Sequence, residues 1–330
     1  MRRRRPERPR DLATAHVSRG VKMTGITWAA IALAAFGSIA WWWAHPPDPA
    51  ADLAARDHAL ARVERAPAPE LGARVERWRM ISTSGDTVTG LWRGPAPRRD
   101  PDTGSPAWAV VLLGGIGTDD RATLLVPDSL PVGVLSVSWP WKGSRHMGRR
   151  EFVMHLPAIR AAMLATPAAM ARGVAAVHHV APGDRVALLG ASVGAPPTIA
   201  TLALTRPDAL VIVDGAADLG RLLASETART LGGGAAARLV APAAGALAAR
   251  LVSSLEPARH AGEAQGIPTL LLDAQGEERL PRPCITALHA AFPAAARGTH
   301  PGRHMRPEEH AEILAIVDAA WRWLSALPPA

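Results

Sequence analysis

The feature that most constrains the fold is a short apolar run that ends in a serine between two glycines. Residues 186–189 are uninterrupted apolar residues, and the pattern Gly-x-Ser-x-Gly follows at once with Gly190, Ser192 and Gly194. A buried strand that turns directly into a helix strains the residue at its apex and brings neighbouring backbone close to it. Glycine two positions before and after the apex relieves this crowding, because a Cβ there would collide. The sequence therefore predicts that Ser192 projects from a sharp turn, with the backbone N–H of Val193 beside it.

A simpler interpretation is that Ser192 only caps a helix after a glycine-rich turn. Pro196 and Pro197 either lie in the first turn of that helix or delay its start, because proline is tolerated only there. The pattern alone does not separate a nucleophile from a cap. The rest of the chain has to supply the partners that a reactive serine needs.

Apolar runs alternate with helical stretches through most of the chain. The runs lie at residues 108–113, 132–137, 186–189, 209–213 and 269–273. They are continuous rather than alternating, which indicates strands buried on both faces of a parallel sheet that has helices on either side. An entry hairpin is expected around residues 84–86. A long Ala-rich excursion at about residues 215–266 is expected to be helical and cap-like. The sequence therefore predicts an α/β domain over residues 75–330.

The N-terminus has a different composition. Residues 1–22 form a basic tail, and residues 23–44 contain no charged side chain and have three consecutive tryptophans near their end. This segment is long enough to cross a bilayer, which takes about 20 residues, and its tryptophans are placed at the expected interface. The positive-inside rule predicts a cytoplasmic N-terminus and a domain in the periplasm or outside the cell. Residues 45–74, rich in Pro and Ala, are expected to form a stalk.

The alternative for the N-terminus is a cleavable signal. Residues 38–40, with the sequence Ser-Ile-Ala, would form a small-residue cleavage site, and the protein would then be secreted. The bulky tryptophans after this site and the long basic tail favour a retained anchor. The lipid bilayer is therefore an expected partner.

The net charge of +8 does not indicate nucleic-acid binding. Residues 1–25 carry eight basic and two acidic side chains, which leaves a charge of +2 for the rest of the chain. A nearly neutral body provides no phosphate-binding face. The single cysteine, Cys284, excludes an internal disulfide and disfavours a structural zinc site.

The order of these parts resembles the α/β-hydrolase fold over residues 75–327. An entry hairpin, a glycine turn after Leu113, the elbow from Gly190 to Gly194, a late strand with an acid and a final histidine occur in the order of that family. The resemblance implies a serine hydrolase that cleaves a carboxylic ester or a related acyl bond with a Ser-His-acid triad. It implies a small-molecule acyl substrate and no cofactor.

In this family the acid follows the penultimate strand, usually four residues before a proline. Glu277 stands at that place, before Pro281. Glu278 is adjacent to it, and relatives whose acid follows the preceding strand would nominate Asp214 or Asp218. Each of these carboxylates also has a plain interpretation as a solvated group in a polar loop.

The family's histidine lies in a Gly-x-His loop before a terminal helix, and in this chain it is His304. His300 would lie at the end of the last strand and His310 inside the first turns of the helix, so both are alternatives. Three histidines this close also suggest a metal site. The Pro-Gly pair between the first two keeps them off one helical face, and no cysteine or spaced aspartate completes a site nearby. We therefore expect no metal.

The family's oxyanion hole has two backbone N–H donors, one after the nucleophile and one after an early strand. Val193 and Ile116 would supply them, although relatives often have His-Gly where this chain has Gly114 and Gly115. These glycines also resemble the start of a dinucleotide fingerprint. The third glycine is missing, however, and acidic residues follow that would repel a pyrophosphate.

The resemblance implies a mechanism in which His304, oriented by Glu277, takes the proton of Ser192 as it attacks a carbonyl, and water then releases the acyl-enzyme. Two functions compete with it. One is a binding or scaffolding module at the membrane that kept the fold without the chemistry, and the other is a nicotinamide-binding α/β domain. For a hydrolase, residues 139–141 and the helical excursion would line an apolar acyl pocket, or else serve core packing.

Overall fold

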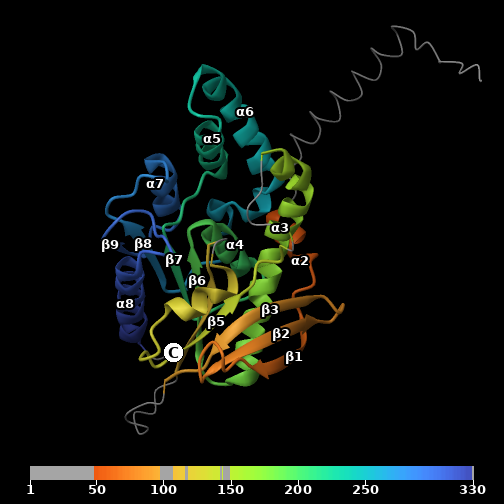
Figure 1. The fold of residues 1–330 in the computed structure, drawn as a ribbon, viewed down its shortest axis with the longest axis vertical. Coiled ribbons are helices and arrows are strands. Elements are labelled where there is room, and N and C mark those ends of the chain that lie inside the picture. The colour runs from red at the N-terminus through yellow and green to blue at the C-terminus, as the bar shows by residue number, and fades with distance from the viewer. Residues whose placement is uncertain (1–47, 97–106, 116–117, 142, 144–148, 329–330) are drawn as a thin grey trace, which may run out of the picture. The chain divides into compact units, whose positions relative to one another are not determined.

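A computed structural model describes residues 48–96, 107–115, 118–141, 143 and 149–328 of the chain. In the described part, one sheet has nine strands in the order β1-β2-β3-β5-β4-β6-β7-β8-β9 (Figure 1). The strands are β1 (Leu60–Pro67), β2 (Val75–Ser82), β3 (Thr87–Arg93), β4 (Trp108–Leu113), β5 (Val132–Val137), β6 (Arg185–Ala191), β7 (Ala209–Val213), β8 (Thr269–Ala274) and β9 (Ala296–His300). The pairs from β1 to β5 are antiparallel, and those from β5 through β4 to β9 are parallel.

Helices cover both faces of the sheet. They are α2 (Pro49–Ala54), α3 (Arg149–Val180), α4 (Ala195–Ala200), α5 (Leu219–Thr230), α6 (Ala235–Leu251), α7 (Arg282–Ala291) and α8 (His310–Ala326), with short 3-10 turns that include η2 (Asp119–Leu125), η3 (Ser192–Gly194) and η5 (Ser253–Leu255). One apolar cluster joins the sheet to α3, α4 and α7, and a second joins its other face to α8 and η2. The α/β architecture with a mostly parallel sheet is therefore confirmed.

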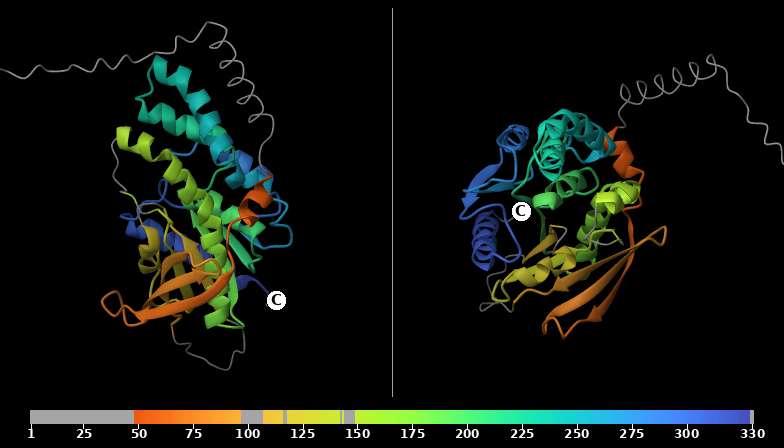
Figure 2. Two further views of the ribbon diagram at one scale, coloured as in Figure 1. Left: turned by 90° about the vertical axis from the view of Figure 1, so that its right-hand side faces the viewer. Right: turned by 45° about the horizontal axis from the view of Figure 1, so that its top comes forward.

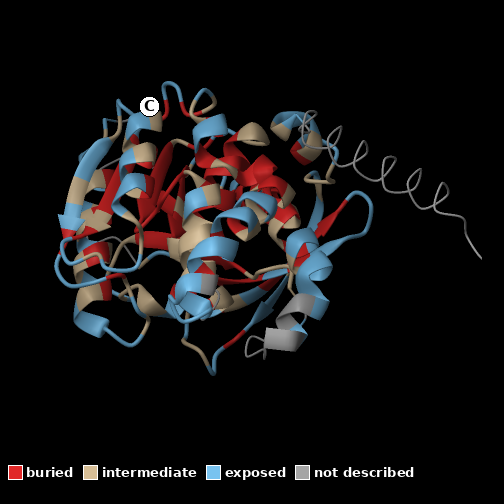
Figure 3. Ribbon diagram, turned by 90° about the horizontal axis from the view of Figure 1, so that it is seen from above, coloured by how far each residue is buried: buried red, intermediate tan, exposed pale blue. Residues whose placement is uncertain are grey.

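The central strands owe their position to their continuous apolar sequence. Every residue of β4, β5 and β7 is buried, as expected for strands that are covered on both faces. Buried residues accordingly concentrate along the sheet, and exposed ones lie on the outer sides of the helices (Figure 3). The predicted hairpin is the β2–β3 pair, and its Trp78 and Trp92 stack with ring centroids 4.8 Å apart.

The stalk predicted for residues 45–74 is wrong for much of that stretch. Strand β1 pairs with β2 along its length, and Leu53 of α2 is completely buried. The Ser254 hydroxyl donates to Asp52 at 2.6 Å, which holds α2 against η5. The edge position of β1 explains the misleading sequence, because an edge strand carries exposed charged residues such as Arg62 and Arg65. The domain begins before Val75.

The excursion predicted at residues 215–266 is helical. Helices α5 and α6 form a hairpin that extends away from the sheet (Figure 2). Its base packs on α2, α3 and α4 through a separate apolar cluster that includes Leu219 and Val252. Beyond this base, α5 contacts the loop after β8, where Arg229 donates to the carbonyl oxygen of Arg279 at 2.7 Å.

The predicted basic tail at residues 1–22 and membrane span at residues 23–44 lie outside the described residues. Within the described ranges, no helix is both long enough and apolar enough to cross a bilayer.

Candidate active site

Ser192 stands at the turn between β6 and α4. Its φ is +54°, a backbone conformation that is strained for a residue with a side chain. A Cβ on Gly194 would lie 2.5 Å from the carbonyl oxygen of Leu113, and one on Gly190 would lie 2.6 Å from Oγ1 of Thr198. Both elbow positions therefore require glycine, as the sequence pattern predicts.

The proline pair after the elbow fits the start of the next helix. Pro196 and Pro197 lie in the first turn of α4, where a missing N–H costs no intrahelical hydrogen bond. The backbone thus passes directly from strand through η3 into helix, and the side chain of Ser192 is left partly exposed.

His304 faces this serine from the loop between β9 and α8. Its Nε2 lies 2.7 Å from Oγ of Ser192, and its Nδ1 lies 2.8 Å from Oε2 of Glu277. Because the Glu277 carboxylate only accepts, Nδ1 carries a proton and Nε2 is free to accept the serine proton. His304 is buried, so the ring is held between these two partners.

Glu277 is fixed by the loop after β8. Its second oxygen, Oε1, accepts from the backbone N–H groups of Arg279 at 2.6 Å and Leu280 at 2.9 Å. Burial alone would raise the pKa of Glu277, but the hydrogen bond from His304 and those from the two N–H groups outweigh it and lower the pKa. The carboxylate is therefore ionised at neutral pH.

The acid loop and the histidine loop are also tied to each other. The N–H of Gln275 donates to the carbonyl of His300 at 3.0 Å, and the N–H of Gly276 donates to that of Gly302 at 2.8 Å. These bonds continue the parallel pairing of β8 and β9 beyond the strands. Backbone hydrogen bonds thus set the separation of the acid and the histidine.

A second carboxylate and a second histidine lie behind this group. Asp214 follows β7 directly, and its Oδ1 accepts from Nε2 of His300 at 3.0 Å. The same carboxylate accepts from the N–H groups of Ala274 at 2.9 Å and Met305 at 2.7 Å. Its Oδ2 also lies 3.9 Å from Nδ1 of His304. Asp214 therefore anchors the loops that carry both the acid and the histidine.

The remaining candidates lie away from Ser192. Asp218 caps α5 by accepting from the N–H of Arg221, and Glu278 is exposed and pairs with Arg303 at 3.6 Å. His310 is exposed at the first residue of α8. The structure thus brings Ser192, His304 and Glu277 together and leaves these three alternatives outside the group.

The loop after β4 approaches the same serine. Gly115 and Val193 both line the cavity at Ser192, while Ile116, the second expected N–H donor, lies outside the described residues. The indole N–H of Trp139 donates to the carbonyl of Gly114 at 3.0 Å, and the Thr118 hydroxyl donates to that of Gly115 at 3.0 Å. The loop is therefore anchored without the histidine that relatives often have.

Asp214, Glu277 and His304 have ligand atoms within 4.8 Å of one another, which is compatible with a metal ion. Their hydrogen bonds provide another reason for this proximity. Nδ1 of His304 already donates to Glu277, and three donors already occupy Asp214. The hydrogen bonds account for the arrangement in full.

The pairing of Asp214 with His300 is the part of the site that the sequence did not indicate. The sequence suggested Asp214 as an alternative acid and His300 as an alternative base. It did not indicate that the two would pair with each other. The available signal was their position at the carboxyl ends of β7 and β9, which meet at one edge of a parallel sheet.

No protein-family model matches the sequence, and no curated protein is similar to it. Among solved structures, the puromycin-hydrolyzing peptidase of Mycobacterium tuberculosis is 20% identical with a TM-score of 0.55, over 80% of this chain and 41% of that one. The acetyl xylan esterase from Paenibacillus sp. R4 is 17% identical with a TM-score of 0.53, over 87% and 93%. An esterase of Pyrococcus furiosus is 15% identical with a TM-score of 0.50, over 80% and 97%.

These neighbours are α/β-hydrolase esterases and peptidases. At such identities the likeness shows that this chain has the same fold. The chain spans less than half the length of the peptidase and nearly the whole length of the two esterases.

Proposed function

We propose that this chain is a serine hydrolase that cleaves carboxylic esters or related acyl bonds. The observation that carries the proposal is the line of hydrogen bonds from Ser192 through His304 to Glu277, at 2.7 and 2.8 Å. It stands at the wall of a cavity large enough for a small substrate. The fold shared with esterases and peptidases supports it.

In the proposed reaction, Nε2 of His304 takes the hydroxyl proton as Oγ of Ser192 attacks the acyl carbon. The Glu277 carboxylate stabilises the imidazolium that forms. The N–H of Val193 and, by the family resemblance, that of Ile116 would stabilise the negative oxygen. The imidazolium then protonates the leaving alcohol. A water molecule, deprotonated by His304, attacks the acyl-enzyme and releases the acid and free Ser192.

An ester is favoured over a peptide as the substrate. The matches to the two esterases cover more than nine tenths of each of those proteins, whereas the match to the peptidase covers 41% of it. The shared fold thus accounts for nearly the whole of those two esterases and for less than half of that peptidase, which supports an ester as the substrate.

The test compares the wild type with Ser192→Ala. A fluorophosphonate probe should label the wild type and not the variant, because only an activated serine reacts with it. Hydrolysis of p-nitrophenyl esters should fall to background in the variant while its melting temperature stays close to that of the wild type. A wild type that is neither labelled nor active would favour the binding or scaffolding module, and an active Ser192→Ala variant would exclude this nucleophile.

We also propose that residues 23–44 hold the domain at a membrane, with the N-terminus in the cytoplasm and the domain on the other side. The support is the uncharged stretch with its tryptophans and the basic tail before it. Full-length protein should stay in the membrane pellet after carbonate extraction, and protein that lacks residues 1–44 should not. Shortening of the chain after export would indicate the cleaved, secreted form instead.

A further inference from the structure

A cavity of about 480 Å³ lies at Ser192, on the face of the sheet that α8 and η2 cover. Leu112 and Leu189 contribute to it from β4 and β6, Leu125 from η2 and Ile316 from α8. A cavity of this size is typical of a site for a small organic ligand.

The described lining is almost entirely apolar outside the reactive group. Apart from Ser192 and His304, its polar side chains are those of Thr118, Arg279 and Glu308. Residues 139–141 do not line it, and neither does the helical excursion at residues 215–266. The apolar surface beside the serine therefore comes from the sheet, η2 and α8, and not from the segments that the sequence suggested.

A second, smaller cavity of about 40 Å³ continues this apolar surface. The two cavities share four wall residues, and the second extends along α8 to Trp321 and Leu324. The shared residues are Leu112, Val126, Leu189 and Val317. Because they share these walls, the two cavities are adjacent, and we refer to the pair as the channel, which begins at the reactive serine and follows α8 along the sheet.

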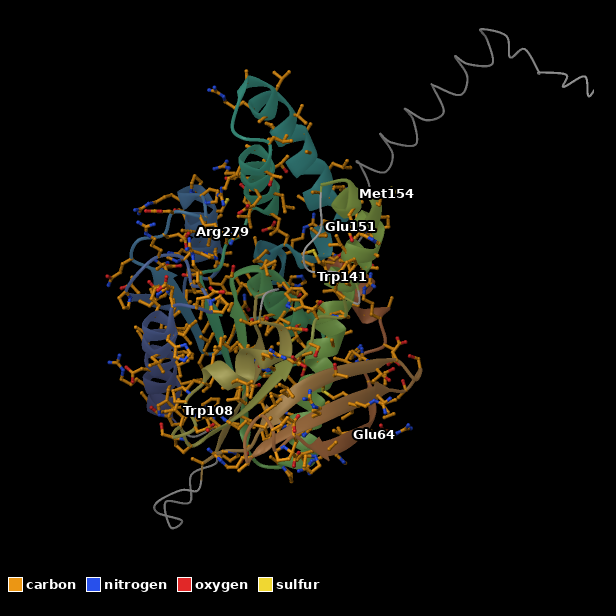
Figure 4. The ribbon with its side chains drawn as sticks, in the orientation of Figure 1. Glu64, Trp108, Trp141, Glu151, Met154 and Arg279 are labelled. Atoms are coloured by element: carbon orange, nitrogen blue, oxygen red, sulfur yellow. The ribbon has the colours of Figure 1, made fainter. Side chains whose placement is uncertain are left out.

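The polar and apolar ends of this channel point in opposite directions. Arg279 and Glu308 are exposed, and Figure 4 shows Arg279 beyond the carboxyl ends of the strands. Trp108 marks the opposite end of β4 in the same view. The second cavity is lined by Val110 of β4 and by Val132, the first residue of β5, so it lies toward that opposite end. The channel is thus polar at the end near Arg279 and apolar at the end near Val132.

The channel lies where a short turn and small side chains, rather than a long helix, cover this face between β4 and α8. The chain returns from β4 to β5 through η2, a 3-10 turn of seven residues, rather than through a long helix. On the other side, α8 presents a stripe of apolar residues that includes Ile316, Val317 and Ala320. A short turn and a small side chain such as Ala320 leave room that a full helix would fill.

We propose that this channel binds the acyl chain of the substrate, and that the chain is an unbranched aliphatic chain of medium length. The proposal rests on the proposed serine hydrolase function. The acyl carbon meets Oγ of Ser192, the chain extends along α8, and the leaving alcohol stays at the mouth near Arg279 and Glu308. The apolar side chains that line the channel along α8 offer no hydrogen-bond partners, which favours methylene groups and disfavours a sugar or a peptide in the same place.

The strands set the length of chain that fits. From Gly114, beside the serine, to Val110 in the second cavity, β4 advances by four residues, or about 13 Å. An extended aliphatic chain advances about 1.25 Å per bond, so a chain of roughly eight to ten carbon atoms spans about 9–11 Å, which is most of that distance. The second cavity is narrow, so it limits the length of the acyl chain that can be bound.

The experiment measures kcat/KM for p-nitrophenyl esters from acetate to decanoate. In the wild type, kcat/KM should rise by up to about fourfold for each buried methylene and then level off or fall. Val317→Trp places a large ring where the two cavities meet, so kcat/KM for octanoate should fall at least tenfold while that for acetate stays within about twofold. Leu314→Trp, on the exposed side of the same helix, is the matched control and should change neither value.

A wild type without preference for longer chains would overturn the proposal. A folded Val317→Trp variant whose kcat/KM falls by the same factor for every ester would also overturn it. Should that variant fail to fold, Val317→Phe provides the smaller obstruction and Val317→Ala the opposite change, which should favour longer chains. If kcat/KM depended on acyl-chain length in the same way in all folded variants, the channel would again be refuted.

Binding separates this proposal from the proposed function. If the wild type neither hydrolyses esters nor reacts with a fluorophosphonate, the hydrolase function fails. Titration calorimetry with 1-octanol then tests the channel alone. Octanol binding that Val317→Trp removes and Leu314→Trp keeps would sustain an aliphatic-chain site, and no binding would overturn it.

Discussion

Nε2 of His300 lies 3.0 Å from Oδ1 of Asp214, and neither side chain has any exposed surface. Nδ1 of the same ring lies 3.0 Å from the carbonyl oxygen of Pro301. Both ring nitrogens therefore face acceptors, which favours a proton on each and a positive charge on the ring. Burial alone would lower the pKa of His300, but the hydrogen bond and the charge of Asp214 outweigh it and raise the pKa.

This ion pair should make stability depend on pH in a defined direction. A pKa raised above the ordinary value of 6.5 gives a contribution that is fully present below that pH and is lost as pH rises through the folded-state pKa. His300→Gln should therefore lower the free energy of unfolding by about 2–4 kcal/mol at acidic pH, and by less in alkaline solution. Urea unfolding of both proteins from about pH 5.5 to about pH 9 measures the difference.

His310→Gln is the control for this series. His310 is exposed at the start of α8, so its replacement should leave the profile of the wild type unchanged. A difference between wild type and His300→Gln that stays constant over the whole pH range would show that folding does not raise the pKa of His300.

Replacement of Glu277 by Gln should lower kcat by more than the loss of the negative charge alone would. Oε1 of Glu277 accepts from the N–H groups of Arg279 and Leu280, so the carbonyl oxygen of Gln would turn toward them. Its NH₂ group would then face Nδ1 of His304 and favour the tautomer with the proton on Nε2, which cannot accept the proton of Ser192. We expect kcat to fall by roughly 10³–10⁴ and KM to change little.

Steady-state kinetics of three variants test this argument. Glu277→Asp keeps the charge and should retain more activity than Glu277→Gln. Glu278→Gln changes an exposed neighbour that pairs with Arg303 and should behave like the wild type. If Glu278→Gln were the inactive variant, the acid would have been assigned to the wrong residue.

Local sequence patterns predicted the elements that depend on local physics. The buried strands follow from continuous apolar runs, and the elbow follows from the spacing of Gly190, Ser192 and Gly194 around a turn where a Cβ would collide. The resemblance of their order to the α/β-hydrolase fold then indicated His304 and Glu277 as the partners that lie beside Ser192.

Features that depend on distant partners could not be predicted in this way. Strand β1 has an exposed, charged sequence, and only its pairing with β2 identifies it as part of the sheet. Asp214 and His300 meet because the register of β7, β8 and β9 places the ends of these strands together. The channel depends on the area of the sheet that the short turn η2 covers. Patterns of strand and helix residues in the sequence do not specify that area.

Replacement of Gly194 by Ala should disrupt the elbow. The new Cβ would lie 2.5 Å from the carbonyl oxygen of Leu113, which is backbone of β4. Strand β4 is paired on both sides, so it cannot shift to make room. We expect a loss of about 1–3 kcal/mol of unfolding free energy and a large fall in kcat as Ser192 moves.

Gly262→Ala is the matched control for Gly194→Ala. A Cβ at Gly262 would have no atom within 4 Å, so stability and activity should stay close to those of the wild type. Denaturation curves and ester hydrolysis are measured for both variants. A stable, fully active Gly194→Ala variant would contradict the close approach of the elbow to β4.

Replacement of Trp139 by Phe tests how the loop after β4 is held. The indole N–H of Trp139 donates to the carbonyl of Gly114 at 3.0 Å, and Phe keeps an aromatic ring without that donor. Removing an oxyanion donor costs about 10²–10³ in kcat, so loosening the loop that precedes the proposed donor Ile116 should cost less, roughly tenfold. The loss should appear in kcat and in the rate of fluorophosphonate labelling, with little change in KM. Trp108→Phe, at the far end of β4, is the control and should lower stability without a specific effect on kcat. If both replacements lowered kcat equally, the Trp139 hydrogen bond would not serve the reactive serine.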